Sequence, residues 1–174
     1  MAVAIKAHGF PNIKIFNGGL GDWKRAGLPI ESIEPLPEYT GPTISPPDLY
    51  RLIRKAEANG CRNKDGSPML TLIDFRASCL ISKKIGGDHY KIKTSCPIIT
   101  RQLDDFMDRK IIGEIPRSGT VVCISETGKR DSYLQRYLYK YGLHSIISLE
   151  NGMRDWLKQA YPAEKLKCPG NNAE

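Results

Sequence analysis

The sequence predicts an α/β fold in which helices cover both faces of a parallel sheet. Short apolar segments rich in β-branched residues, typical of buried strands, alternate with segments whose apolar residues recur every three or four positions, as in amphipathic helices. In a chain that alternates in this way, each helix carries the chain back to the end of the sheet at which the previous strand began. Successive strands therefore run parallel. The length of 174 residues suits one domain with an appendage.

The first predicted elements of this fold are a helix and a buried strand. The helix begins at Ser45, whose hydroxyl can cap the first turn, passes through two prolines that are tolerated there, and ends at Gly60. Residues 69–75 (MLTLIDF) form an apolar run, which predicts a strand buried on both faces. A loop containing glycine follows this strand.

The middle of the chain is predicted to contain an extended segment, a helix and the most regular strand. Residues 92–96 are expected to be extended and to stop at Pro97. Residues 98–111 are predicted to form a helix, because their apolar residues are spaced for its faces. Residues 120–124 (TVVCI) are apolar and mostly β-branched, which predicts a strand.

The last predicted elements are a helix, a strand and a second helix. Apolar residues at helical spacing predict a helix over residues 131–141, which Gly142 ends. Residues 145–149 are predicted to form a strand, and residues 153–160 a final helix.

The first 30 residues repeat a pattern that is found again near the end of the chain. Every matched pair lies 133 positions apart, and the six pairs are Gly9 and Gly142, Ile13 and Ile146, Gly19 and Gly152, Asp22 and Asp155, Trp23 and Trp156, and Pro29 and Pro162. A fixed period of this kind indicates a duplicated unit. We expect the two tryptophans to pack in a core, and residues 12–16 to form a strand whose exposed edge pairs with another segment or chain.

The repeat divides the chain into four parts. Residues 1–30 are predicted to be the C-terminal fragment of a first repeat, and residues 31–45 a proline-rich linker. Residues 46–162 are predicted to form one complete domain, and residues 163–174 a C-terminal tail.

Composition argues against several functional classes. The five cysteines form no CxxC pair and the three histidines are scattered, so we expect no metal site and no cofactor. We expect the cysteines to be reduced thiols. The net charge of +7 favours anionic partners, but no aromatic residues interleave with the basic clusters, so nucleic acid is not expected. No apolar run approaches the ~18 residues of a membrane span. We expect a cytoplasmic protein; the alternative is a signal peptide upstream of a truncated first repeat.

Several motifs, in this order, resemble those of the rhodanese (sulfurtransferase) family. Residues 72–76 (LIDFR) resemble a family strand motif, residues 87–90 (GDHY) followed by Pro97 resemble the next, and residues 151–156 (NGMRDW) resemble the start of the terminal helix. Residues 9–29 resemble that terminal block again. The resemblance implies a five-stranded parallel sheet with helices on both faces, in a tandem protein that lacks most of its first domain.

The resemblance places the chemistry of such a domain in the loop after residues 120–124. In the family this loop has the form CxxGxR, and its backbone N–H groups form an anion cradle that also lowers the pKa of the nucleophilic cysteine. Here the loop is Ser125, Glu126, Thr127, Gly128, Lys129 and Arg130. Its glycine and arginine match the family's, but serine stands at the cysteine position. Serine cannot hold sulfane sulfur as a persulfide, and the loop supplies no general base for it.

Two functions remain open at this stage. In the first, the module is non-catalytic: it binds a small anion through residues 125–130 or a protein partner, or it is the silent half of a tandem sulfurtransferase. In the second, it is an active thiosulfate or persulfide sulfurtransferase that uses Cys123 or a missing partner domain. A buried core thiol is the simpler interpretation of Cys123, because it lies within a strand. Phosphatase (Cx5R) and P-loop patterns both match poorly.

Three further polar residues have structural interpretations. Asp74 and Arg76 are expected to form an ion pair at the end of their strand, and His89 is expected to form a local hydrogen bond rather than to act as a base.

Overall fold

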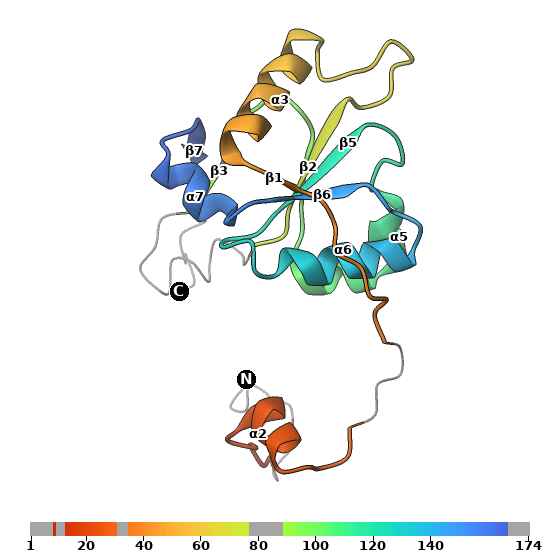
Figure 1. The fold of residues 1–174 in the computed structure, drawn as a ribbon, viewed down its shortest axis with the longest axis vertical. Helices are drawn as coiled ribbons and strands as arrows, with labels where there is room; N and C mark the ends of the chain where they lie inside the picture. Colours follow the sequence, from red (N-terminus) through yellow and green to blue (C-terminus); the bar gives the residue numbers. More distant parts are fainter. Residues whose placement is uncertain (1–8, 10–12, 31–34, 77–88, 167–174) are drawn as a thin grey trace. The chain divides into compact units, whose positions relative to one another are not determined.

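The computed structural model describes residue 9 and residues 13–30, 35–76 and 89–166 (Figure 1). They belong to two compact units, Met1–Pro35 and Leu36–Glu174, and each unit is described by itself. Among the helices of these residues, none has the length and apolarity that crossing a membrane requires.

The second unit is built on a five-stranded parallel sheet. Its strand order is β1-β6-β5-β2-β4, with bounds of Thr43–Ile44 for β1, Ile146–Leu149 for β6, Thr120–Ile124 for β5, Leu70–Asp74 for β2 and Ile98–Thr100 for β4. The register places Leu72 beside Val122 and Val122 beside Ile147. All five residues of β2 are buried, as expected for a strand covered on both faces. The predicted α/β fold with a five-stranded parallel sheet is therefore confirmed.

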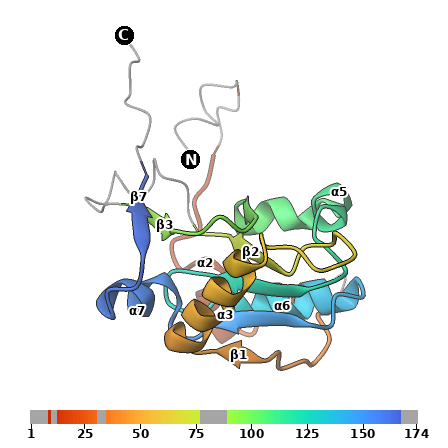
Figure 2. The same cartoon turned by 90° about the horizontal axis from the view of Figure 1, so that it is seen from above.

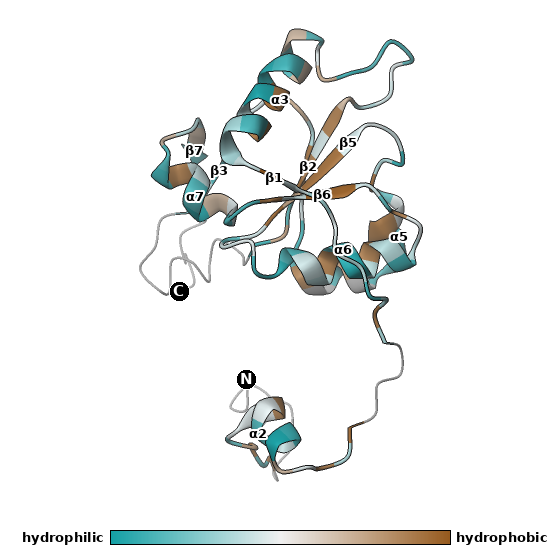
Figure 3. Ribbon diagram, viewed as in Figure 1, coloured by the Kyte–Doolittle hydropathy of each residue, from teal (hydrophilic) through white to brown (hydrophobic). Residues whose placement is uncertain are grey.

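Helices cover the two faces of this sheet (Figures 1 and 2). One face is covered by α3 (Pro46–Ala58) and α7 (Gly152–Lys158), and the other by η1 (Leu103–Met107), α5 (Arg109–Gly113) and α6 (Asp131–Lys140). Alternate residues of the central strand point to opposite faces, so Val122 packs with α3 and Cys123 packs with α6. Figure 3 shows the resulting apolar layer, with the most hydrophobic segments in β2, β5 and β6.

The predicted helix over residues 98–111 is wrong at its start. Ile98–Thr100 form the edge strand β4, which pairs with Leu72, Ile73 and Asp74 of β2. Three consecutive β-branched residues favour a strand, and the extended conformation lets them complete the sheet. The apolar residues at helical spacing belong to the shorter elements η1 and α5 further along the chain.

Apart from the extended segment, the other predicted elements of this unit are confirmed to within about two residues. At the start of α3, the Ser45 hydroxyl accepts a hydrogen bond from the Asp48 backbone N–H, as predicted for its cap. The predicted extended segment, residues 92–96, shares only Ile92 with the observed strand β3 (Tyr90–Ile92), which pairs antiparallel with β7 (Ala163–Lys165). Strand β1 lies within the predicted linker and β7 within the predicted tail, so both of these segments contribute strands to this unit.

The expectation of reduced thiols is wrong for two of the cysteines. Cys61, just after α3, forms a disulfide with Cys96, just before β4. The two segments are already held together because the Glu57 carboxylate accepts hydrogen bonds from the Thr94 hydroxyl and the Ser95 backbone N–H. The two cysteines are 35 residues apart in the chain, so the sequence alone does not indicate that they lie close together.

The first unit contains the helix α2 (Gly19–Arg25), within the block that resembles the family's terminal helix. Residues 13–16 form no strand, which corrects the prediction over its described part, because no described segment pairs with their backbone. Trp156 is fully buried, whereas Trp23 is 36% exposed, so the predicted core packing is confirmed only for Trp156. Residues of the first unit contribute most of the large exposed apolar side chains: Ile15, Phe16, Leu20, Trp23, Leu28 and Ile30.

The local geometry of α2 nevertheless repeats that of α7. Trp23 Nε1 donates to the Pro29 carbonyl oxygen at 2.9 Å, and Trp156 Nε1 donates to the Pro162 carbonyl oxygen at 3.0 Å. In each helix the first residue is a glycine with positive φ, 56° in α2 and 63° in α7. The backbone hydrogen bond that closes each helix, from residue i+5 to the tryptophan carbonyl, measures 3.2 Å in both.

Candidate anion-binding site

Loop 125–130 connects the carboxyl end of β5 to the amino terminus of α6. This is the edge of a parallel sheet at which α/β proteins usually bind ligands. The first turn of α7 fixes the loop from one side, because Met153 N–H donates to the Ser125 carbonyl at 2.9 Å and Arg154 N–H donates to the Glu126 carbonyl at 3.1 Å. Helix α7 thus holds the backbone of residues 125 and 126 in place.

Two glycines permit this conformation. Gly128 has a φ of 76°, and an added Cβ would lie 3.0 Å from the backbone nitrogen of Asn151. Gly152 has a φ of 63°, and an added Cβ would overlap the Ser125 carbonyl oxygen. Both positions therefore exclude side chains, because of the left-handed backbone and the close approach of the loop to α7.

Four backbone N–H groups of the loop are available to a ligand. Those of Glu126, Thr127, Lys129 and Arg130 have no acceptor within the part of the chain that the structure describes. The fifth, of Gly128, donates to the Ser125 hydroxyl oxygen at 2.9 Å. The side chains of Lys129 and Arg130 are exposed beside them. Free amides and two cations at a helix amino terminus form a favourable environment for an anion.

A buried carboxyl group lies under this loop, and sequence reasoning assigned it no role beyond helix capping. Asp131, the first residue of α6, is 1% exposed, and neither carboxylate oxygen has a hydrogen-bond partner among the described residues. Burial raises the pKa of Asp131 to about 7, and the nearby Ser125 hydroxyl, outside hydrogen-bonding geometry, opposes this rise. A potential base therefore stands next to the loop, although none stands within it. The signal available in the sequence was an acidic residue immediately after a basic loop.

Cys123 lies away from the loop's ligand side. Its side chain is fully buried among the apolar residues that pack under α6. Burial, and then the nearby Asp131 carboxylate, raise the pKa of the Cys123 thiol well above its ordinary value. A thiol that is both inaccessible and difficult to ionise is a poor nucleophile, which argues against the alternative that it carries sulfur.

The predicted ion pair of Asp74 and Arg76 is confirmed, and it is linked to the loop. Arg76 Nε and Nη2 donate to the two Asp74 carboxylate oxygens at 2.8 and 2.7 Å, and Nη1 lies 3.4 Å from the Glu126 carboxylate. Burial alone would lower the pKa of Arg76, but the Asp74 carboxylate, together with that of Glu126, outweighs burial and raises that pKa. Burial, followed by the charge of Arg76, lowers the pKa of His89. Residues 87 and 88 of the same motif lie outside the described part.

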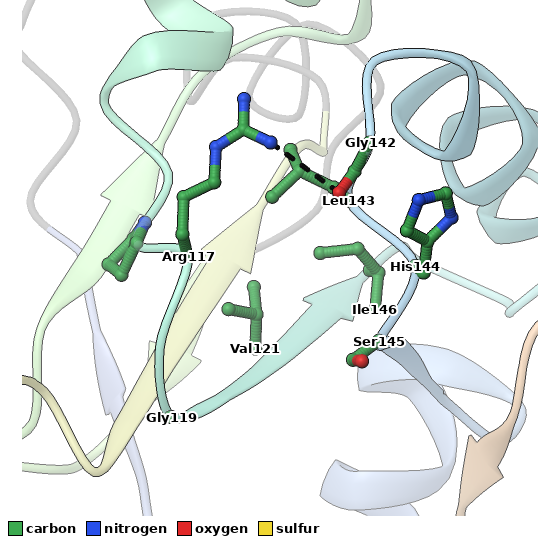
Figure 4. A pocket seen from close by; sticks show the side chains of 9 residues that line it. Arg117, Gly119, Val121, Gly142, Leu143, His144, Ser145 and Ile146 are labelled. Carbon is green, nitrogen blue, oxygen red and sulfur yellow. Dashed lines mark hydrogen bonds between the residues drawn. The ribbon is translucent and has the colours of Figure 1, made fainter.

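Two cavities lie elsewhere in this unit. One, of about 250 Å³, is at the amino ends of β5 and β6 and is lined in part by Arg117 and His144 (Figure 4). The Arg117 guanidinium already donates to the carbonyls of Tyr141 and Gly142 at the end of α6, at 3.3 and 3.4 Å. The other, of about 540 Å³, lies between α3 and β7. Neither includes a residue of loop 125–130, and the described residues contain no group of three side chains suited to hold a metal ion.

Comparison with known proteins identifies the fold. No protein-family model and no curated protein matches the sequence. The structure is similar to a rhodanese-related protein of Thermoplasma volcanium, with a TM-score of 0.50 and 20% identity over 71% of this chain and 97% of that one. It is also similar to a rhodanese-like domain of the Anabaena protein Alr3790, with a TM-score of 0.51 and 15% identity over 78% and 89%. A polysulfide-sulfur transferase of Wolinella succinogenes gives a TM-score of 0.51 and 20% identity over 76% and 82%. The second unit of this chain therefore has a rhodanese-like fold.

Proposed function

We propose that the second unit is a rhodanese-like module that holds a small oxyanion in loop 125–130 and does not transfer sulfur. The observation that carries this proposal is Ser125 at the opening of the loop, where the resemblance requires a nucleophilic cysteine. The rest of the loop keeps the glycine, the arginine and the free amides that a cradle needs.

The absence of sulfur transfer follows from the chemistry of the residues near the loop. A persulfide needs a thiolate, and the hydroxyl of Ser125 cannot replace it. The free thiol of the described part, Cys123, is buried beneath α6. Among the described residues, sulfur chemistry therefore has no accessible thiol nucleophile.

The binding of an anion is supported by the charge and the hydrogen-bond donors of the loop. Lys129 and Arg130 at the amino terminus of α6 oppose the helix dipole when the site is empty, and a bound anion would reverse that effect. The single loop acid, Glu126, is directed toward Arg76 and so offsets little of this positive charge.

We further propose that residues 1–30 are the end of a first rhodanese-like repeat. The matched sequence and the recurrent tryptophan–proline hydrogen bonds of α2 and α7 support this assignment. In such a tandem protein the second unit would be the silent half, beside a sister domain or a protein partner.

Mass spectrometry of the intact protein tests the first proposal. After incubation with thiosulfate or polysulfide, the reduced wild-type protein should gain no sulfur. Ser125→Cys should gain one cyanide-releasable sulfur atom if the cradle is intact, and Thr127→Cys, in the same loop, is the matched control that should not. A sulfur adduct that maps to Cys123 in the wild type would refute the proposal and identify an active sulfurtransferase. Failure to react even when Ser125→Cys is combined with Asp131→Asn, which removes the neighbouring negative charge, would show that the loop is no cradle.

A further inference from the structure

Asp131, immediately after loop 125–130, has a carboxyl group that lacks a hydrogen-bond donor in the described part of the chain. Its carboxyl group is buried, its two oxygens have no donor among the described residues, and no ion pair reaches it there. A buried acceptor without a donor is unfavourable, so the position favours any ligand that supplies the missing hydrogen.

The protein side can supply at most part of this need. The Ser125 hydroxyl is the nearest polar group, and its oxygen already accepts from the Gly128 N–H. A hydroxyl has a single proton to donate, so it can serve one carboxylate oxygen of Asp131 and leaves the other free. Cys123 beneath them is a weak donor in the apolar layer.

The loop thus presents two kinds of group to an anion. The free N–H groups of residues 126, 127, 129 and 130 require acceptors, which any oxyanion supplies. The carboxylate requires a donor, which only an oxyanion with its own O–H supplies. A site built to hydrogen-bond a hydroxyl rejects close analogues that lack it, because the site's own polar group then stays unpaired.

We propose that loop 125–130 selects an oxyanion that still carries a proton near neutral pH, of which hydrogen phosphate is the prototype, and rejects sulfate and thiosulfate. This inference rests on the proposed function and names the chemical class of its ligand. In the bound state the anion's oxygens accept from the loop amides, and its O–H donates toward Asp131, directly or through the Ser125 hydroxyl. No covalent step is involved.

The charged surroundings of Asp131 are consistent with this assignment. Lys129 and Arg130 are exposed at the end of the loop and offset the repulsion between the carboxylate and an anion. Arg76, two residues after the end of the neighbouring strand β2, is paired with Asp74 and does not neutralise Asp131. From β5, the Cys123 thiol stays protonated because burial raises its pKa.

Calorimetric titration of the full chain with inorganic phosphate, sulfate and thiosulfate tests the proposal. At about pH 8 the carboxyl of Asp131 is ionised, since its pKa is about 7, and sulfate carries no proton. We expect phosphate to bind at least about tenfold more tightly than sulfate or thiosulfate. Phenyl phosphate distinguishes free phosphate from a phosphate ester. Its second pKa is about 6, as for other phosphomonoesters, so it has lost its proton at this pH and should bind as weakly as sulfate.

Two variants separate hydrogen bonding from simple charge. Asp131→Asn has almost the same size and an amide that can donate, so the preference for phosphate over sulfate should fall to about twofold or less. Glu126→Gln removes the same charge from the exposed loop, so any change in affinity should be small and equal for all the anions, and the preference should remain. Equal affinities in the wild type, or a preference unchanged in Asp131→Asn, would overturn the inference while anion binding itself stands. Failure of every anion to bind would overturn both proposals, and the thiosulfate mass spectra would still report separately on sulfur transfer.

Discussion

The buried carboxyl of Asp131 should make the protein less stable as the pH rises from about 4 to about 7. A folded-state pKa of about 7, against an ordinary value of 3.8, means that the folded protein binds one more proton than the unfolded chain between these two values. The free energy of unfolding then falls by about 1.4 kcal/mol per pH unit across this window, about 4 kcal/mol in all. Below the lower value both states are protonated and the effect is absent. Above about pH 7 the penalty is complete.

Asp131→Asn should remove this dependence. We expect the variant to be more stable than the wild type at about pH 8, by as much as about 4 kcal/mol less the cost of burying an amide, and to show a flatter pH profile. Urea unfolding followed by circular dichroism at several pH values measures both quantities. Asp48→Asn is the matched control, because Asp48 also lies in the first turn of a helix but is exposed, with its pKa lowered by hydrogen bonds from Ser45 and Arg51. Its profile should keep the wild-type slope from pH 5 to 8. An Asp131→Asn profile as steep as the wild type's would refute the reasoning.

Three other substitutions test the framework around the site. Gly152→Ala should lower the free energy of unfolding, measured in thermal melts, by about 1–3 kcal/mol, because the position has a positive φ and the added Cβ would overlap a loop carbonyl. Gly113→Ala is the control and should have little effect, because an added Cβ there meets no other atom of the described residues. Cys61→Ala, or reduction of the bond to Cys96, should lower stability by about 3–4 kcal/mol, as expected for a 35-residue loop; insensitivity to reductant would show that the bond does not form. Asp74→Asn leaves a buried arginine without its carboxylate and should lower stability by about 3–5 kcal/mol in urea unfolding; a loss below about 1 kcal/mol would mean that the pair is solvated.

The fold was predictable because its elements are locally consistent. Ser45 followed by two prolines, the apolar runs of β2 and β5, and the glycine after α6 each predict the structure that forms. The error at residues 98–100 arose because their identity as a strand depends on the edge of β2, which no local pattern reports. The Cys61–Cys96 disulfide was missed for the same reason, since only the packing of α3 brings its two segments together.

The sequence identified the candidate loop, but not the electrostatics of the residue beneath it. The motif gave residues 125–130, and the structure describes how α7 fixes their carbonyls and which amides remain free. What decides the chemistry of Asp131 is its burial, and burial depends on how α6 docks on the sheet. From sequence alone, such a carboxylate is expected to be a solvated charge or a helix cap, because its burial is not known.

Under the proposed function, Ser125 and Asp131 would each disfavour sulfur transfer, for independent reasons. The serine removes the thiol, and the neighbouring carboxylate would hinder ionisation of any thiol placed there, as it already contributes to the raised pKa of Cys123. Ser125→Cys alone should therefore accept sulfur slowly, because its thiolate would form beside a negative charge. Adding Asp131→Asn removes that charge, and the double variant should react faster than the single one near neutral pH. Equal rates in the thiosulfate assay would show that the carboxylate does not act on residue 125, and with it the link between Asp131 and the ligand would fail.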